Sequence, residues 1–173
     1  MRDQSRTVIL ALGSNLGDRH EILQGGVDAI AGIGQVRVAA VSPLYETAPV
    51  GGPSQPDYLN AVVLARATLP SRDLLDRLHE IEAAFDRVRE VRWGARTLDI
   101  DIIASGDERS DDPELTLPHP RAHERAFVLA PWHDIDPGAV LPGRGPVAAL
   151  LEKAGRSGVR RVKTGLIAPG EDA

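Results

Sequence analysis

The sequence predicts an α+β sandwich of the ferredoxin-like βαββαβ type, with one helical layer packed on a mainly antiparallel sheet. Two observations carry this prediction. Short apolar runs rich in β-branched residues alternate with segments whose apolar residues recur at helical spacing. Along the chain these segments follow one another as strand, helix, strand, strand, helix, strand, which is the order of elements in that motif.

The first half of the motif opens with "TVILAL" at 7–12, a short apolar run that predicts a buried strand. The "GSNLGD" segment that follows predicts a turn, because it lacks the ending of a phosphate-binding P-loop. Asp18 is a suitable N-cap for a helix that runs to about Ile33. "QVRVAAVS" at 35–42 alternates in the manner of a second strand.

The second half follows a loop rich in proline and glycine at 48–57, where regular structure is not expected. "YLNAVVLARAT" at 58–68 predicts a third strand. After the N-cap candidate Ser71, "RDLLDRLHEIEAAFDR" predicts the clearest helix of the chain. A loop at 87–96 precedes "TLDIDIIA" at 97–104, which predicts the fourth strand.

The rest of the chain predicts smaller elements. An acidic loop, "GDERSDDPE", leads into an extended proline-containing segment and a short helix from about His123 to Trp132. "GPVAALLEKA" at 145–154 predicts a last helix, and the tail at 155–173 holds a weakly strand-like "VRRVK" before an end expected to be disordered. No internal repeat or linker is visible, so residues 1–173 are expected to form a single domain.

The composition argues against several classes of protein. The chain of 173 residues carries a formal charge of −5, which argues against general binding to nucleic acids or membrane surfaces. It has no cysteine, so disulfide bonds and thiolate metal ligands are excluded and a cytoplasmic location is expected. No apolar run approaches the length of a signal peptide or a membrane span. A soluble monomer that binds small molecules is the expected form.

Two aspartates interrupt the fourth predicted strand, in "RWGARTLDIDIIAS" at 92–105. Because alternate residues of a strand share a face, Asp99 and Asp101 are expected on one surface, with the apolar residues around them facing the core. Two neighbouring carboxylates repel each other unless a cation lies beside them, and Mg²⁺ shares carboxylates with water and phosphate. The alternative is a solvated strand face on which the aspartates only keep an edge soluble.

Four arginines precede these aspartates on the predicted loop, namely Arg87, Arg89, Arg92 and Arg96. Guanidinium groups bind phosphate oxygens with paired hydrogen bonds and stay charged at any working pH. Together with metal-bound carboxylates, they form the charge pattern needed to transfer a phosphoryl or pyrophosphoryl group from a nucleotide. The alternative is a solvated surface loop, or one that contacts RNA. Trp93 is the single aromatic residue among the arginines, and this and the acidic net charge argue against RNA.

Five segments of the chain resemble one known family: "ALGSNLGDR", "SPLYETAPVGG", "QPDYLNAVV", "RWGARTLDIDI" and "LTLPHPRAHERAFVLAP". Their order and spacing, from residue 8 to about 150, resemble 6-hydroxymethyl-7,8-dihydropterin pyrophosphokinase of folate biosynthesis. The resemblance implies transfer of the β,γ-pyrophosphoryl group of ATP to the hydroxymethyl group of the pterin, with release of AMP. It also implies that Asp99 and Asp101 hold two Mg²⁺ ions bound to ATP.

The resemblance assigns roles to the positions that match the family's motifs. Catalytic roles fall on Arg87, Arg96, Asp99 and Asp101. The pterin site falls on Thr47, Val50, Tyr58, Asn60 and Phe127. ATP contacts fall on Glu82, Arg89, Trp93, Thr116, His119 and Arg125. Tyr58 and Phe127 would hold the flat ring between them, while Asn60, on the same strand face as Tyr58, would offer a donor and an acceptor to its edge.

Some positions differ from the family's pattern. Asp86 stands where a glycine commonly precedes the first loop arginine, and Ala95 replaces a usual proline before Arg96. The other differences are Ala48, His79, Glu114 and Pro120. These positions lie near the nucleoside end of the site and on the loop, so they bear on ATP affinity more than on the reaction.

Without the resemblance, several of these residues have simpler interpretations. Tyr58 and Phe127 would be ordinary core residues. His119 would be a turn residue between two prolines, and Trp93 a hinge plug or a contact for a partner. Two other functions also fit the residues: a ferredoxin-like RNA-binding module that uses the basic loop, and a homologue that binds pterin or ATP without turnover. The RNA-binding module predicts salt-sensitive RNA binding with no need for Mg²⁺.

Overall fold

The structure is a computed structural model that describes residues 5–48, 57–86 and 97–166. Its main sheet has six strands, in the order β10-β3-β4-β1-β5, with β2 also paired to β4. In chain order these strands are β1 (Arg6–Ser14), β2 (Val36–Val41), β3 (Tyr45–Thr47), β4 (Tyr58–Ala67), β5 (Asp99–Ser105) and β10 (Val159–Arg161). The strand pairs of this sheet are antiparallel, as predicted.

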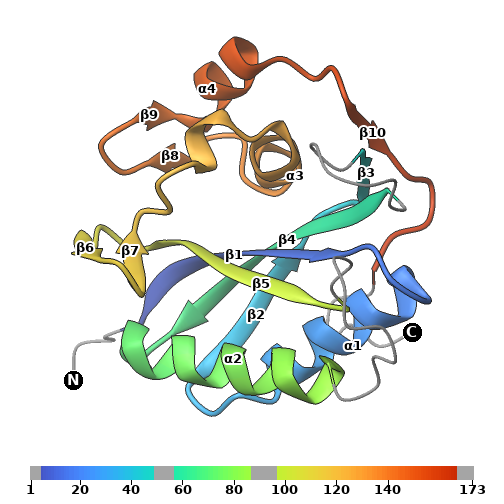
Figure 1. The fold of residues 1–173 in the computed structure, drawn as a ribbon. Coiled ribbons are helices and arrows are strands. Elements are labelled where there is room, and N and C mark those ends of the chain that lie inside the picture. Colours follow the sequence, from blue (N-terminus) through green and yellow to red (C-terminus); the bar gives the residue numbers. More distant parts are fainter. Residues whose placement is uncertain (1–4, 49–56, 87–96, 167–173) are drawn as a thin grey trace.

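Two short hairpins and four α-helices complete the described part of the chain (Figure 1). The hairpins pair β6 (Ser110–Asp112) with β7 (Leu115–Leu117), and β8 (Val140–Leu141) with β9 (Gly145–Pro146). The helices are α1 (Arg19–Ala31), α2 (Ser71–Asp86), α3 (Ala126–Ile135) and α4 (Val147–Ala154), with a 3-10 turn, η1 (Ala122–Glu124), before α3. Across these ranges no helix is long and apolar enough to cross a membrane.

Helices cover both faces of the sheet, with α1 and α2 on one side and α3 and α4 on the other (Figure 1). Val8 and Leu10 of β1 belong to the core that includes the buried residues of α1 and α2. Ile9 and Val62 belong to a second core with the apolar residues of α3 and α4. The expectation of one helical layer is therefore wrong, because the second face of the sheet is apolar as well and must also be covered.

The start of α1 agrees with the prediction, whereas the start of α2 differs from it. The Asp18 side chain caps α1 by accepting a hydrogen bond from the backbone N–H of Glu21 at 3.0 Å. Helix α2 begins at Ser71 itself, and the Ser71 hydroxyl is hydrogen-bonded to Ser105 Oγ and Glu108 Oε1, each at 2.8 Å. Ser71 therefore ties α2 to the end of β5 instead of capping the helix.

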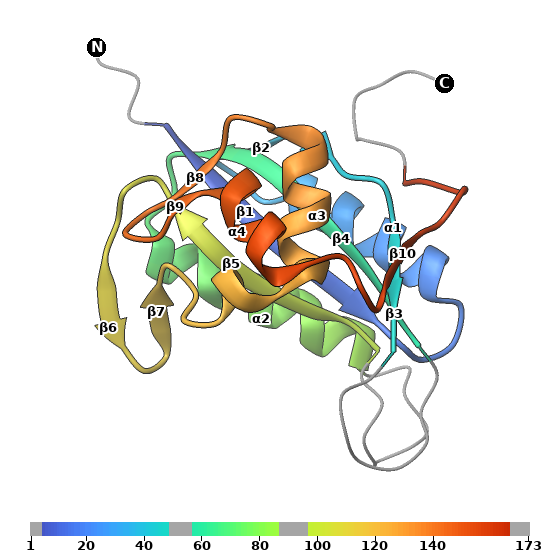
Figure 2. The ribbon, with the colours of Figure 1, turned by 90° about the horizontal axis from the view of Figure 1, so that it is seen from above.

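Short strands also form where the sequence predicted no strand. β3 lies within "SPLYETAP", and β6 lies within the acidic stretch. Each has three residues, which is too few for an alternating pattern to be visible in the sequence. The weakly strand-like "VRRVK" contains β10, which runs beside β3 (Figure 2).

Candidate active site

The two aspartates of β5 project from one face of the sheet, as predicted. Asp101 is exposed and Asp99 half-buried, while Leu98, Ile100 and Ile102 are buried in the core that includes α1 and α2. Asp101 forms no ion pair with another residue that the structure describes. Its carboxylate is therefore open to a ligand or a cation.

The strand register places predicted metal and pterin residues in one row across the sheet. Gly13 of β1 lies opposite Asp99 of β5 on one side and opposite Asn60 of β4 on the other. Asn60 in turn lies opposite Tyr45 of β3. Opposed residues point to the same face and neighbouring strands are about 4.8 Å apart, so Asn60 and Asp99 are separated by about 10 Å. Helix α3, which carries Phe127, covers this face.

The Asn60 side chain is held by two hydrogen bonds. It is buried, and its Nδ2 donates to Thr47 Oγ1 at 2.9 Å and to the Tyr45 carbonyl oxygen at 3.4 Å. These bonds use both amide hydrogens, so the Asn60 carbonyl oxygen is left to accept a hydrogen bond from a ligand. The sequence predicts that Asn60 offers a ligand both a donor and an acceptor. In the structure Asn60 can offer only the acceptor, and the hydroxyl hydrogen of Thr47 can serve as the donor.

Gly13 leaves the space that the Asn60 carbonyl group needs. A Cβ atom at position 13 would lie 3.2 Å from Asn60 Oδ1 and 3.8 Å from Tyr58 Cδ1.

We expect Gly13→Ala to displace the Asn60 side-chain amide and lower the affinity for the pterin about tenfold, as for one weakened buried hydrogen bond. Calorimetric titration with the pterin measures the effect. Gly34→Ala, at a position with no atom within 4 Å, is the control, and equal affinities of the two variants would contradict the expectation.

Glu82, a predicted ATP contact, lies beside the aspartates. Its Oε2 accepts a hydrogen bond from the backbone N–H of Ile100 at 2.9 Å, so the end of α2 covers part of β5. Burial raises the pKa of Glu82, the Ile100 hydrogen bond opposes this shift, and the charges of Asp99 and Asp101 raise the pKa further. A cation bound to the two aspartates would lower the pKa of Glu82 again.

The donor set on β5 fits a hard cation such as Mg²⁺. Within residues 5–48, 57–86 and 97–166, no three or more His, Asp or Glu side chains are grouped as a complete metal site. A cation at Asp99 and Asp101 would therefore complete its coordination shell with oxygens of water and of a ligand. Mg²⁺ has this preference, because it keeps several waters and binds one or two carboxylates together with substrate phosphates.

His119, another predicted ATP contact, lies near Asp101. Its backbone N–H donates to the Ile103 carbonyl oxygen at 2.8 Å, which fastens this segment to β5. Its Nδ1 accepts from the backbone N–H of Arg121 at 3.2 Å, so the neutral ring carries its proton on Nε2. Burial lowers the pKa of His119, and the charge of Asp101 opposes this shift. Arg125 lowers the pKa further, so a neutral imidazole with an Nε2–H donor is favoured.

Tyr58 and Phe127, the predicted pterin clamp, lie in elements that pack together. Tyr58 is the first residue of β4 and Phe127 lies in the first turn of α3, and both side chains are half-buried. Helix α3 packs against β4. The guanidinium carbon of Arg125 lies 5.5 Å from the centre of the Phe127 ring. A positive charge thus lies against one ring of the predicted pterin clamp.

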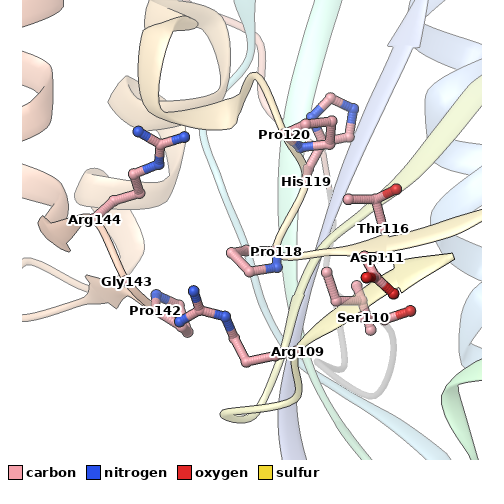
Figure 3. Close-up of a pocket in the computed structure, with 11 residues that line it drawn as sticks. Arg109, Ser110, Asp111, Thr116, Pro118, His119, Pro120, Pro142, Gly143 and Arg144 are labelled. Atoms are coloured by element: carbon pink, nitrogen blue, oxygen red, sulfur yellow. The ribbon is translucent and has the colours of Figure 1, made fainter. Parts of the chain in front are cut away.

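A cavity of about 530 Å³ opens between the β6–β7 hairpin and the turn that joins β8 to β9 (Figure 3). Its walls include the predicted ATP residues Thr116 and His119 and the arginines Arg109 and Arg144. The hydroxyl of Thr116 donates to the Asp112 carbonyl oxygen at 3.0 Å, so it already supports the hairpin. The volume is that of a small-molecule site, and the two guanidinium groups favour an anionic ligand.

Six residues named from the resemblance lie outside the described residues, namely Val50, Arg87, Arg89, Trp93, Ala95 and Arg96. Among the other positions that differ from the family's pattern, Glu114 accepts a hydrogen bond from Arg72 Nη1 at 3.0 Å. Arg72 also donates to Asp112, so the β6–β7 hairpin is tied to the start of α2. Asp86 is the last residue of α2.

No sequence pattern indicates a role for Gly13, Arg19 or Glu46, which border this site. The "GSNLGD" pattern predicts a turn, and only the strand register shows that Gly13 separates Asn60 from Asp99. Arg19 donates to Glu46 Oε1 at 2.9 Å. These two residues are 27 positions apart, so no local pattern could pair them.

Comparisons with known proteins show which family the chain is similar to. The family model described as 7,8-dihydro-6-hydroxymethylpterin-pyrophosphokinase matches residues 9–137. The chain is 41% identical over 155 residues to a 2-amino-4-hydroxy-6-hydroxymethyldihydropteridine pyrophosphokinase of Pseudomonas aeruginosa, and the match covers 90% of this chain and 96% of that protein. It is 45% identical over 169 residues to the protein of the same name from Mycobacterium tuberculosis, with 88% of each covered.

A solved structure with a similar fold is the crystal structure of a triple mutant of Plasmodium falciparum HPPK-DHPS with pteroate. The TM-score is 0.67 at 14% sequence identity. The match covers 91% of this chain and 46% of that chain, so this chain spans about half the length of that protein. At this low identity the likeness concerns the fold alone.

Proposed function

The chain belongs to the 7,8-dihydro-6-hydroxymethylpterin-pyrophosphokinase family, and from this membership we propose that it transfers the β,γ-pyrophosphoryl group of ATP to 6-hydroxymethyl-7,8-dihydropterin. The products of this transfer are AMP and the pterin diphosphate. As a pyrophosphokinase, the chain is an enzyme of the transferase class that acts in folate biosynthesis.

One observation carries the assignment of the site: the row Asn60–Gly13–Asp99 across β4, β1 and β5. It brings a buried hydrogen-bonding residue for a heterocycle and an aspartate for a metal onto one face, about 10 Å apart. This spacing allows one end of a flat ring to reach Asn60 while its hydroxymethyl group points toward the aspartates. A pterin bound there would therefore present its hydroxyl group to the phosphates of ATP.

On the metal side, we assign two Mg²⁺ ions to Asp99 and Asp101, which the donor chemistry of two carboxylates on one face of β5 supports. Mg²⁺ supplies charge neutralisation at the phosphate oxygens during such a transfer. The chain's own carboxylates fix where that charge lies. Glu82 adds a third carboxylate nearby, and its hydrogen bond to Ile100 keeps this part of β5 in place.

On the nucleotide side, we assign ATP binding to His119, Arg125 and Thr116, which carry no negative charge. His119 offers its Nε2–H and Arg125 its guanidinium group, while Thr116 lies on the β6–β7 hairpin. The resemblance assigns catalytic contacts with the phosphates to Arg87 and Arg96, and ATP binding to Arg89 and Trp93. The pterin hydroxyl oxygen forms a bond to the β-phosphorus as the bond from that phosphorus to the α-phosphate oxygen breaks, and AMP leaves. The hydroxyl proton passes to solvent.

We also propose that the chain has a ferredoxin-like core and forms a single domain. The βαββαβ order of β1 to β5, with β2 and β3 taken as one strand position, supports a ferredoxin-like core. We assign the whole of residues 1–173 to one pyrophosphokinase domain. A cytoplasmic location agrees with the absence of cysteine, and the formal charge of −5 argues against binding to nucleic acid or membrane. The monomer that binds ATP and the pterin is part of the same proposal.

The products identify the reaction. Incubation of the protein with ATP, Mg²⁺ and 6-hydroxymethyl-7,8-dihydropterin is expected to give AMP and a diphosphorylated pterin in equal amounts, followed by phosphorus NMR and chromatography. The control omits the pterin, and little AMP is expected there. Formation of ADP with a monophosphorylated pterin would contradict pyrophosphoryl transfer, and AMP formed without the pterin would indicate hydrolysis instead.

A further inference from the structure

We propose that residues 159–166, here called the C-terminal strap, position the pterin-binding strand β3, and that Arg160 does so through the Glu46 side chain. The proposal rests on the proposed function, because it concerns the affinity of that site for the pterin. It gives the tail of the chain a role that no sequence pattern indicated. Arg160 acts here as a positioning residue and does not touch the substrate.

The backbone of the strap extends the sheet beside Thr47. Strand β10 pairs with β3, with Val159 opposite Thr47 and Arg161 opposite Tyr45. One residue further, the backbone N–H of Val162 donates to the Leu44 carbonyl oxygen at 2.8 Å. Strand β3 has only three residues, and without β10 it would be an edge strand paired on one side alone. The strap therefore fixes the strand that holds the Thr47 hydroxyl against Asn60.

Side chains connect the strap to both pterin-binding strands. Arg160 donates to Glu46 Oε2, and Arg19 Nη1 donates to Glu46 Oε1 at 2.9 Å. The same Arg19 Nη1 donates to the backbone carbonyl oxygen of Asp57 at 2.8 Å. Glu46 immediately precedes Thr47, and Asp57 immediately precedes Tyr58. One cluster of charges thus links the position of Thr47 to that of Tyr58.

The Glu46 carboxylate is well placed to link Arg160 to the position of β3. Its side chain is 16% exposed, whereas that of Arg160 is 74% exposed. Hydrogen bonds from Arg19 and Arg160 keep the pKa of Glu46 below its ordinary value, although burial opposes this shift. The carboxylate therefore stays charged at neutral pH and holds both guanidinium groups.

A second set of contacts links the strap to α3 and α1. Arg161 Nη2 lies 3.2 Å from Asp134 Oδ2 on α3, and the Tyr45 hydroxyl donates to the same oxygen at 2.5 Å. Beyond β10, the Gly165 carbonyl oxygen is 2.9 Å from His20 Nε2 on α1. Figure 2 shows this segment passing from α4 along β3. The strap thus joins the helix that carries Phe127 to the strand that carries Thr47.

A single exposed ion pair adds little to overall stability, so the effect expected from Arg160 is on the geometry of the pterin site. We expect Arg160→Ala to raise the KM for the pterin about fivefold to tenfold, since small displacements of binding groups are costly. The KM for ATP and the kcat are expected to stay within about twofold, because Asp99, Asp101 and Thr116 lie on β5 and β7, with which β10 does not pair. Arg160→Lys should recover part of the pterin affinity.

The matched control is Arg77→Ala, which removes an exposed arginine from an ion pair with Glu80 on α2. This control should leave both KM values unchanged. Glu46→Gln should act in the same direction as Arg160→Ala, and the double variant should be little worse than Glu46→Gln alone because the two changes break one contact. An unchanged KM for the pterin in Arg160→Ala would overturn the proposal. Equal rises in both KM values, with a lower melting temperature, would overturn it as well.

Hydrogen exchange separates this proposal from the proposed function. Arg160→Ala is expected to speed exchange of the backbone amides of residues 45–47 and 58–60 several-fold, with no change in α2. If the wild-type protein forms no AMP with the pterin, the proposed function fails while this exchange result still shows whether the strap positions β3. Unchanged exchange at residues 45–47 would overturn the strap proposal whatever the activity.

Discussion

Asp101→Asn is expected to lower kcat at least about a hundredfold while the protein still folds. Loss of one carboxylate charge weakens the binding of Mg²⁺ where phosphate charge develops, an effect of about 3 kcal/mol or more on the barrier. Asp101 is exposed and makes no ion pair within the described ranges, so its replacement should change the free energy of unfolding by less than about 0.5 kcal/mol. AMP release at saturating Mg²⁺ and thermal unfolding measure the two effects.

Asp107→Asn is the matched control, because Asp107 is also an exposed aspartate, on the turn after β5. It should keep full activity and full stability. If Asp101→Asn retains more than a tenth of the wild-type turnover, the assignment of Asp101 as a metal ligand is wrong. If Asp101→Asn unfolds at a much lower temperature than Asp107→Asn, Asp101 supports the fold instead.

Asn60→Leu is expected to weaken pterin binding on the order of a hundredfold, with ATP binding within about twofold. The leucine removes the oxygen that we propose as the acceptor for the ring's edge, and also the donor to Thr47 Oγ1. Two buried hydrogen-bonding groups, one on the ligand and one on Thr47, would then lack partners, and each costs about 1–3 kcal/mol. Calorimetric titrations with the pterin, and separately with a non-hydrolysable ATP analogue, measure the difference.

Thr47→Val provides an intermediate variant. It keeps the shape of the side chain but removes the hydroxyl that accepts from Asn60, so a loss of pterin affinity of about tenfold is expected. Because Asn60 and Thr47 share one hydrogen bond, the losses in the double variant should not add. Pterin affinity within threefold of wild type in Asn60→Leu would show that the ring binds elsewhere.

Local patterns in the sequence were sufficient for the faces of individual strands. The alternation of "LDIDI" predicted that Asp99 and Asp101 face away from Leu98 and Ile100, and the structure confirms it. The Asp18 cap of α1 was also predictable, because a cap depends only on residues one turn apart. These features arise from neighbours in the chain.

Features that depend on distant segments were not predictable in this way. The register that aligns Asn60, Gly13 and Asp99 is set by the packing of three strands, which no single segment encodes. The strap lies on β3 through pairs such as Arg160 and Glu46, which are 114 positions apart. The second helical layer was missed for a different reason: Ile9 and Val62 already made the other sheet face apolar, but continuous apolar runs do not show which helices cover them.

The most direct test is a crystal structure of the protein with Mg²⁺, a non-hydrolysable ATP analogue and 6-hydroxymethyl-7,8-dihydropterin. The result we predict has Mg²⁺ bound by Asp99 and Asp101, and the pterin ring between Tyr58 and Phe127 with its edge on Asn60. Its hydroxymethyl oxygen should point at the β-phosphorus. A pterin bound away from Asn60, or phosphates held between Arg109 and Arg144 with no metal at Asp101, would contradict the proposed site.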